Sequence, residues 1–165
     1  QSEWMDLEFT EALELNHFRK TLQPLLPQGI QLLAAAEVPV SGKSLSQELT
    51  GAVWCFDLVQ DDQTQISVDW SAAVDQLLLA KTLVWHDTDK KGRPRERDCR
   101  PALKALQVTN QIAGGAARLR LEAAVDDMGR SLRPAQIQHW LADTVGQPLQ
   151  VQRLTREALI LSAQC

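Results

Sequence analysis

The segment A-V-W-C-F-D-L-V at residues 52–59 decides the fold, because β-branched and aromatic residues at this density are typical of a buried strand. The polar turn D-D-Q at residues 61–63 follows it. Apolar residues then recur at helical spacing over residues 70–78, and Asp69 or Ser71 can cap the first turn of that helix. This order predicts a strand that a turn connects to a helix. The strand and the helix are the first two elements of a β-α-β unit.

The pattern continues toward the C-terminus with strands, a second helix and a further strand. The expected elements are an extended segment at residues 81–88, a hairpin turn at 89–95, a return strand at 103–108, a strand at 117–125, a helix that opens near Pro134 and is stopped by Gly146-Gln147-Pro148, and a final strand between Leu149 and Leu161. Residues 52–161 therefore predict a β-α-β-β-α-β ferredoxin-like unit. The fold class is α+β, with antiparallel sheets and helices on one face.

Toward the N-terminus the pattern predicts half of another such unit. Residues 3–9 alternate apolar and acidic side chains, residues 14–24 have helical spacing, and residues 29–39 look extended and mostly buried. We therefore divide the chain into a partial ferredoxin-like half-unit at residues 1–40, a linker at 41–51 and a ferredoxin-like unit at 52–165. A lone β-α-β half leaves a sheet edge unpaired, so we expect an excised piece of a longer protein or a neighbouring chain that fills the gap.

Composition places the chain among ordinary globular domains. It has 165 residues, of which 44% are hydrophobic and 23% charged, with a net charge of −4, so disordered and fibrous classes are excluded. No stretch approaches 18 consecutive apolar residues, and acids stand where a signal peptide carries basic residues. Three widely spaced cysteines without a C-x-x-C pair argue against a disulfide framework or a metal site. We expect a cytoplasmic protein that contacts no membrane.

Charge is distributed unevenly along the chain. Residues 1–80 hold 3 Lys or Arg and 12 Asp or Glu, a net charge of −9, while residues 81–165 hold 14 and 9, a net charge of +5. The densest basic run lies on the expected hairpin, and arginine and lysine match phosphate groups, so this run is a candidate surface for RNA or another anion. The candidate binding residues are Lys90, Lys91, Arg93, Arg95, Arg97, Asp98, Arg100 and Arg133.

Purely structural interpretations of the same residues also stay open. The basic hairpin can be a solvated element whose cations offset neighbouring acids, and it lacks the paired aromatics of an RNA-recognition sheet. Asp98 and Arg100 form either part of a binding site or a structural pair at the base of the hairpin. Cys99 is either a reactive thiolate beside arginines or a small buried residue.

The sequence offers no catalytic signature. His17, His86 and His139 are far apart and form no helical metal-binding pair, and no phosphate-loop or nucleophile motif occurs. We therefore assign no catalytic residue and no metal ligand.

Four short stretches, in order, resemble an uncharacterised bacterial family, the radical SAM-linked domain. They are E-W-M-D-L-E-F-T-E at residues 3–11, L-L-P-Q-G-I-Q-L-L-A-A-A-E-V-P at 25–39, K-K-G-R-P-R-E-R-D-C-R-P at 90–101 and S-L-R-P at 131–134. The resemblance implies a domain fused to a radical SAM protein or encoded as its partner. Family motif positions are matched by Asp98, Arg100, Pro101, Arg133 and Pro134.

The resemblance also limits what this chain holds. The family's earlier basic strand and Ser-His-Leu-Asp helix are not in this sequence, and neither is C-x-x-x-C-x-x-C. The 4Fe-4S cluster and S-adenosylmethionine are therefore implied for the associated protein, with no cofactor in this chain. We expect a non-catalytic accessory domain that presents substrate or binds RNA. The alternatives are a docking module for the radical SAM core and a small enzyme in which Asp98 acts as acid or base on an anionic substrate.

Overall fold

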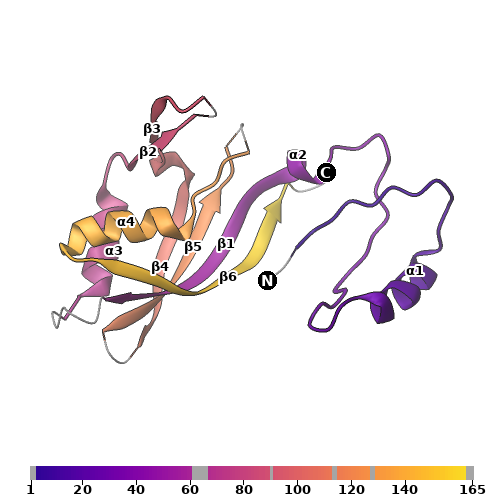
Figure 1. The fold of residues 1–165 in the computed structure, drawn as a ribbon, viewed down its shortest axis with the longest axis horizontal. Helices are drawn as coiled ribbons and strands as arrows, with labels where there is room; N and C mark the ends of the chain where they lie inside the picture. Colours follow the sequence, from indigo (N-terminus) through magenta and orange to yellow (C-terminus); the bar gives the residue numbers. More distant parts are fainter. Residues whose placement is uncertain (1–2, 61–66, 90, 113–114, 127–128, 163–165) are drawn as a thin grey trace.

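The computed structural model describes residues 3–60, 67–89, 91–112, 115–126 and 129–162, and their helices and strands are labelled in Figure 1. In chain order these elements are α1 (Leu15–Leu22), the 3-10 turn η1 (Gln23–Leu25), α2 (Leu45–Glu48), β1 (Leu49–Gln60), α3 (Trp70–Leu79), β2 (Val84–Thr88), β3 (Pro94–Asp98), the 3-10 turn η2 (Arg100–Ala102), β4 (Leu103–Ile112), β5 (Ala116–Ala124), α4 (Pro134–Val145) and β6 (Leu149–Leu161).

The main sheet contains four antiparallel strands in the order β4-β5-β1-β6. α3 lies between β1 and β4 in the chain, and α4 lies between β5 and β6. The two β-α-β halves therefore interleave, with their first strands, β1 and β5, paired at the centre. This connectivity confirms the predicted α+β class and its β-α-β-β-α-β order.

Alternation along β1 separates the two faces of this sheet. Phe56 and Leu58 are fully buried on the helix-covered face, whereas Asp57 between them points to the opposite face. On the neighbouring strand β5, Leu119 lies opposite Phe56 and Arg118 lies opposite Asp57. The register thus pairs apolar with apolar side chains and opposite charges with each other. α3 and α4 pack together on the apolar face (Figure 1).

Both long helices begin and end where the sequence predicts. The Asp69 carboxylate accepts the N–H of Ala72 at 3.0 Å and caps α3, as expected for one of the two candidate caps. Pro134 is the first residue of α4, and Gly146 ends that helix with a φ of 70°, a left-handed conformation that glycine adopts without strain.

The predicted return strand of the hairpin is wrong. β2 pairs with β3, from Val84 opposite Asp98 to Thr88 opposite Pro94, and not with residues 103–108. Those residues belong to β4, which pairs with β5. The reason is the 3-10 turn η2, which redirects the chain between β3 and β4. The hairpin is therefore an insertion between α3 and β4, outside the main sheet.

The two strands predicted near the N-terminus are also wrong. Residues 3–9 and 29–39 form no strand, although the helix predicted between them is present as α1 and η1. An alternating pattern specifies which side chains share a face, but a strand also needs a hydrogen-bonding partner, and no described segment pairs with these residues. None of residues 3–50 is buried. The division into domains stays a prediction.

A matched pair of variants in α3 tests the core. Leu77 is 4% exposed and Leu79 is 83% exposed. We expect Leu77→Ala to lower the free energy of unfolding by about 2–5 kcal/mol, because it leaves a cavity under the sheet. Leu79→Ala is the control and changes it by less than about 0.5 kcal/mol. Urea denaturation followed by tryptophan fluorescence measures both; equal losses in the two variants contradict the packing.

Candidate nucleic-acid interface

The β2–β3 hairpin projects away from the main sheet (Figure 1), and hydrogen bonds hold its turn. The Asp89 carboxylate accepts the N–H groups of Lys91 at 2.8 Å and Arg93 at 3.0 Å, and Arg93 Nε at 2.7 Å. Gly92 adopts a φ of 76°, as the turn sequence predicts. The bonds from Arg93 lower the pKa of Asp89 below its ordinary value of 3.8. The turn therefore has a defined shape although it lies far from the core.

The base of the hairpin is anchored to α4 through aromatic contacts. Trp85 meets the ring of Trp140 edge to face at a centroid distance of 6.2 Å and that of His139 at 5.5 Å. Trp140 Nε1 donates to the carbonyl of Val84 at 2.9 Å. These contacts fix the orientation in which the hairpin leaves the body of the protein.

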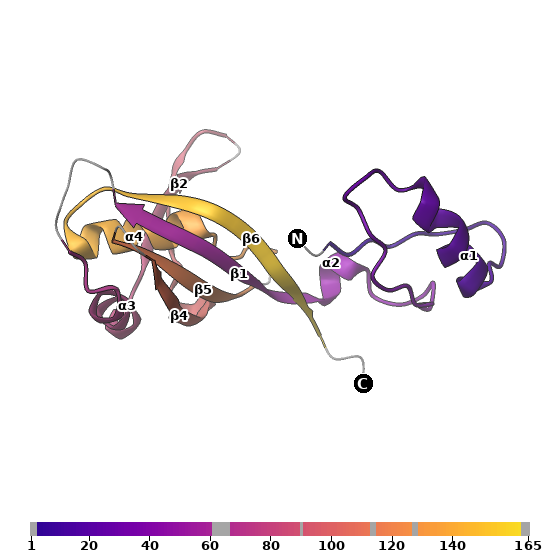
Figure 2. The same ribbon diagram turned by 90° about the horizontal axis from the view of Figure 1, so that it is seen from below.

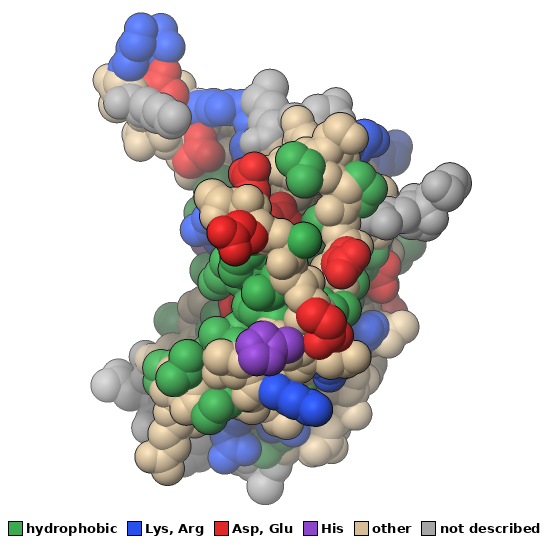
Figure 3. Space-filling model, turned by 90° about the vertical axis from the view of Figure 1, so that its right-hand side faces the viewer, with side chains coloured by type: hydrophobic (Ala, Val, Ile, Leu, Met, Phe, Trp, Pro, Cys, Tyr) green, Lys and Arg blue, Asp and Glu red, His purple; other side chains and the backbone are tan. Residues whose placement is uncertain are grey.

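The two faces of the hairpin differ in charge. Register places Arg95 opposite Asp87 and Arg97 opposite Trp85 on one face, while His86 meets Glu96 at 3.5 Å on the other. Figure 3 shows basic side chains gathered at the end of the molecule where the hairpin projects, with acidic side chains next to them. The hairpin is therefore a mixed surface in which the cations are concentrated at the tip and along one face.

Several predicted binding residues are free to meet a ligand. Lys91 and Arg95 are exposed, Arg97 is half-buried, and none of the three forms an ion pair within the described residues. Arg93 is exposed but pairs with Asp89 at 2.6 Å. Arg133 precedes α4, is exposed and likewise has no ion pair in the described part of the chain. Lys90 lies outside the described residues.

Asp98 and Arg100 are instead engaged by the fold. The Asp98 carboxylate accepts the backbone N–H groups of Leu83 at 2.8 Å and Arg100 at 2.9 Å. The Arg100 guanidinium donates to three backbone carbonyls, those of Leu78 at 2.9 Å, Ala80 at 3.0 Å and Leu103 at 3.2 Å. The two side chains form no ion pair with each other within the described residues, and both bond to the backbone at the base of the hairpin instead. The arrangement is structural, and a direct role of either residue in binding stays a prediction.

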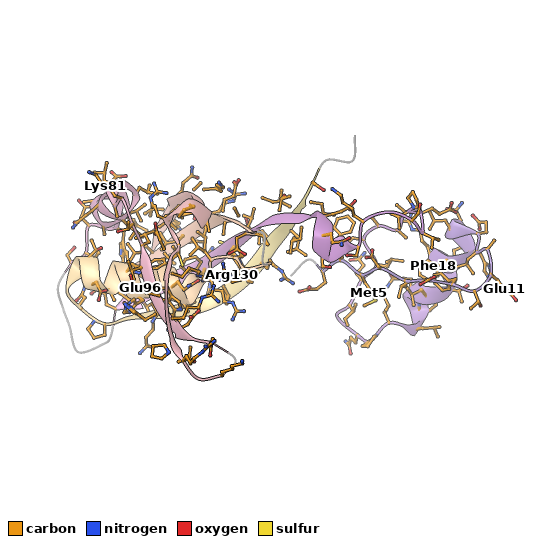
Figure 4. All side chains as sticks on the ribbon, turned by 90° about the horizontal axis from the view of Figure 1, so that it is seen from above. Met5, Glu11, Phe18, Lys81, Glu96 and Arg130 are labelled. Atoms are coloured by element: carbon orange, nitrogen blue, oxygen red, sulfur yellow. The ribbon has the colours of Figure 1, made fainter. Side chains whose placement is uncertain are left out.

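The structure adds a residue that the sequence analysis did not include among its candidates. Arg130, in the loop before α4, lines a cavity of about 70 Å³ together with Arg97, and it pairs with Asp126 at 2.7 Å. Figure 4 shows Arg130 next to the hairpin strand that carries Glu96. Arg97 Nε and Arg130 Nη1 are buried and have no hydrogen-bond partner in the structure. Buried donors are normally paired, so the fold leaves these two donors unused.

The helix-free face of the main sheet carries cations of a different kind. Asp57 is only 4% exposed, and its carboxylate accepts two hydrogen bonds from the Arg118 guanidinium, at 2.7 and 3.1 Å. Arg153 forms a second ion pair with the same carboxylate at 3.8 Å. The bonds to Asp57 raise the pKa of Arg118. Arg120 pairs with Glu157 at 3.2 Å. These arginines neutralise carboxylates of the same face and are less available to phosphate groups.

That face also offers no aromatic platform for nucleobases. The eight aromatic side chains all lie elsewhere: Trp54 and Phe56 are on the helix-covered side of β1, Trp70, Trp85 and Trp140 lie in or beside α3, α4 and the hairpin, and Trp4, Phe9 and Phe18 are N-terminal. RNA-recognition sheets stack bases on such rings. The hairpin is therefore the better candidate for a contact with RNA.

Comparison with protein families gives a match over most of the chain. Residues 1–134 match the family described as uncharacterized protein conserved in bacteria, DUF2344. The chain belongs to this family. The matched region includes the hairpin and ends at the first residue of α4. Searches of the curated proteins and of the solved structures give no match.

The described residues include two free cysteines, Cys55, which is half-buried, and Cys99, which is buried. Cys99 is 3% exposed, and burial raises its pKa, which favours the small buried residue over the reactive thiolate. The described residues contain no group of three His, Cys, Asp or Glu side chains arranged to hold a metal ion. They also contain no helix that is long and apolar enough to cross a membrane.

The hydrogen bonds of Arg100 predict that even a charge-conserving substitution of this residue lowers the free energy of unfolding. Arg100→Lys keeps the charge but cannot reach three carbonyls with one ammonium group, so we expect a loss of about 1–3 kcal/mol in the free energy of unfolding. Arg95→Lys, on the exposed hairpin, is the control and changes it by less than about 0.5 kcal/mol. Urea denaturation measures both. An Arg100→Lys variant as stable as the parent chain means that the three carbonyl contacts contribute nothing.

The hairpin turn predicts a pH dependence. Because the folded chain lowers the pKa of Asp89, the bonds to this carboxylate stabilise the turn at neutral pH and are lost as the pH falls through the lowered value. We expect the Gly92 amide signal in an NMR titration to report a midpoint below 3.8. In Arg93→Gln the midpoint should rise, since one donor to the carboxylate is removed. An unchanged midpoint in that variant refutes the role of Arg93.

Proposed function

We propose that this chain is a non-catalytic accessory domain that binds RNA through the β2–β3 hairpin. The observation that carries the proposal is the contrast between two sets of cations. Arginines on the open sheet face are paired with carboxylates, as in Arg118 with Asp57. Lys91, Arg95 and Arg97 on the hairpin have no such partner within the described residues. Unpaired cations on a projecting element are the ones that phosphate groups can reach first.

The geometry of the hairpin supports contact with the RNA backbone rather than with its bases. The turn is held by Asp89 and the base is held by Trp85, so cations are presented without a large ordering cost. The cavity between Arg97 and Arg130 lies at the base of the same element. With no stacking rings on the open face, sequence preference is expected to be weak and salt dependence strong.

Association with a radical SAM protein is part of the proposal and rests on the resemblance of the four sequence stretches. This chain does not fit the role of cluster carrier, because Cys55 and the buried Cys99 are single free thiols and C-x-x-x-C-x-x-C does not occur. The 4Fe-4S cluster and S-adenosylmethionine would belong to the partner protein. Free thiols also support the proposed reducing, cytoplasmic setting.

A docking module for the radical SAM core is the second candidate. It is favoured by apolar side chains that are exposed near the N-terminus, among them Trp4 at 51%. A small enzyme is the least supported function, because Oδ1 of the only candidate acid or base, Asp98, already accepts two backbone N–H groups at the base of the hairpin. The presentation of an anionic substrate would use the same hairpin as RNA.

Neutralising the hairpin tests RNA binding. We expect a variant with Lys90, Lys91, Arg93 and Arg95 changed to Gln to lose affinity for single-stranded RNA and to show a shallower dependence of log K on log salt, by about 0.7 per lost phosphate contact. Fluorescence anisotropy at several salt concentrations measures both quantities.

The matched control removes the same charge elsewhere. A variant with Gln at Arg19, Lys20, Lys43 and Lys104, all exposed, should keep the affinity and the slope of the parent chain. If both variants lose binding equally, net charge explains the result and the hairpin assignment is wrong. If neither changes, RNA binds elsewhere or not at all.

A further inference from the structure

Exposed apolar side chains are concentrated in the N-terminal arm, which we define as residues 3–44. Twelve large hydrophobic side chains are exposed among the described residues, and ten of them lie between Trp4 and Val40. Figure 2 shows the arm extending from the start of β1, away from the main sheet. Scattered exposed apolar residues are normal, but a concentration of this size marks an interaction surface.

The first part of the arm has the alternating sequence of a strand, and none of its residues pairs with a strand in the described part of the chain. Residues 3–9 alternate, so that Met5, Leu7 and Phe9 share one side and Asp6 and Glu8 the other. The exposed fractions of Met5, Leu7 and Phe9 are 77%, 52% and 51%. An extended segment with a row of apolar side chains and unpaired backbone groups is the template that strand addition uses.

Contacts at both ends hold this segment in place. Glu3 forms an ion pair with Arg156 of β6. The Asp6 carboxylate accepts the N–H of Leu45 in α2 at 2.8 Å, and Phe9 meets Phe18 of α1 at a centroid distance of 5.5 Å. Figure 4 shows Met5 and Phe18 in this part of the molecule, away from the hairpin. The segment is therefore partly preorganised for a partner.

Charge decides which partner fits. Residues 3–14 contain five acids and no Lys or Arg. In an antiparallel pair of two copies centred on Leu7, Asp6 of each copy faces Glu8 of the other, and like charges directly opposite each other destabilise a sheet. A partner strand with basic residues at those positions gains from the same two carboxylates. The acidic arm thus disfavours a second copy of this chain.

We propose that residues 3–9 bind an extended partner segment as an added β-strand. The partner's side chains alternate between apolar residues, which meet Met5, Leu7 and Phe9, and Lys or Arg, which meet Asp6 and Glu8. The arm and the hairpin then serve different partners, because an acidic arm repels the RNA that the hairpin attracts. This inference does not depend on RNA binding by the hairpin.

The test uses the full chain, labelled with ¹⁵N, and short synthetic peptides. In the first peptide valine and lysine alternate, in the second the same residues are arranged in two blocks, and in the third valine and glutamate alternate. We expect the alternating lysine peptide to shift the amide signals of residues 3–9 and to bind roughly tenfold more tightly than either of the others, because register and charge both match. Equal binding of the block peptide reduces the effect to net charge and overturns the proposal.

A charge reversal separates this surface from any other acidic region. Glu8→Lys should weaken the alternating lysine peptide at least roughly fivefold and strengthen the glutamate peptide, whereas Glu37→Lys, also exposed in the arm, should leave both unchanged. Sedimentation of the chain without peptide is the last measurement. A dimer of the parent chain that Leu7→Asp abolishes, by placing a charge at the centre of the apolar row, identifies a second copy as the partner and overturns the proposal, as does the lack of binding by all peptides.

Discussion

The position of the hairpin depends on the guanidinium group of Arg100. This single side chain joins the carboxyl end of α3, through the carbonyls of Leu78 and Ala80, to the first residue of β4. The Asp98 carboxylate accepts a hydrogen bond from the backbone N–H of Leu83, just before β2. An arginine in this place donates to three carbonyls, at the end of a helix and at a chain reversal, that would otherwise lack a hydrogen-bond donor. The hairpin can project because Asp98 joins its two ends to each other and Arg100 ties its base to the end of α3 and the start of β4.

The main sheet determines which cations remain available. Asp57 lies at the centre of the open face, and its burial is possible because Arg118 and Arg153 lie over it. A buried carboxylate without these partners carries a large desolvation penalty, so the two arginines are needed for the sheet itself. The same pairing removes them from the set of phosphate ligands. Lys91, Arg95 and Arg97 of the hairpin have no carboxylate partner in the described part of the chain, and Lys91 and Arg95 are also exposed.

The sequence predicted the elements that depend on local signals. Hydrophobic spacing identified α3 and α4, and Asp69, Pro134 and Gly146 marked their ends, because caps act within one turn of the chain. The partner of β2 was mistaken because the turn between β3 and β4 is fixed by contacts of Arg100 with residues about twenty positions earlier in the chain. No periodic pattern reports such a contact.

The same distinction explains the arm and the cavity. The alternation at residues 3–9 correctly separates apolar from acidic side chains, but it carries no information on whether a second strand is present. Arg97 and Arg130 line one cavity because the base of the hairpin lies beside the loop before α4, so this cavity is visible in the fold and not in the sequence spacing. The signal that was visible in the sequence is the charge asymmetry, −9 in the first 80 residues against +5 in the rest. In the fold the arm, whose residues 3–14 contain five acids and no Lys or Arg, lies at one end and the basic hairpin is set apart from it, so part of the asymmetry becomes two separate surfaces of opposite charge (Figure 1). Two such surfaces on one chain can bring a basic protein segment and a polyanion together without competing for the same residues.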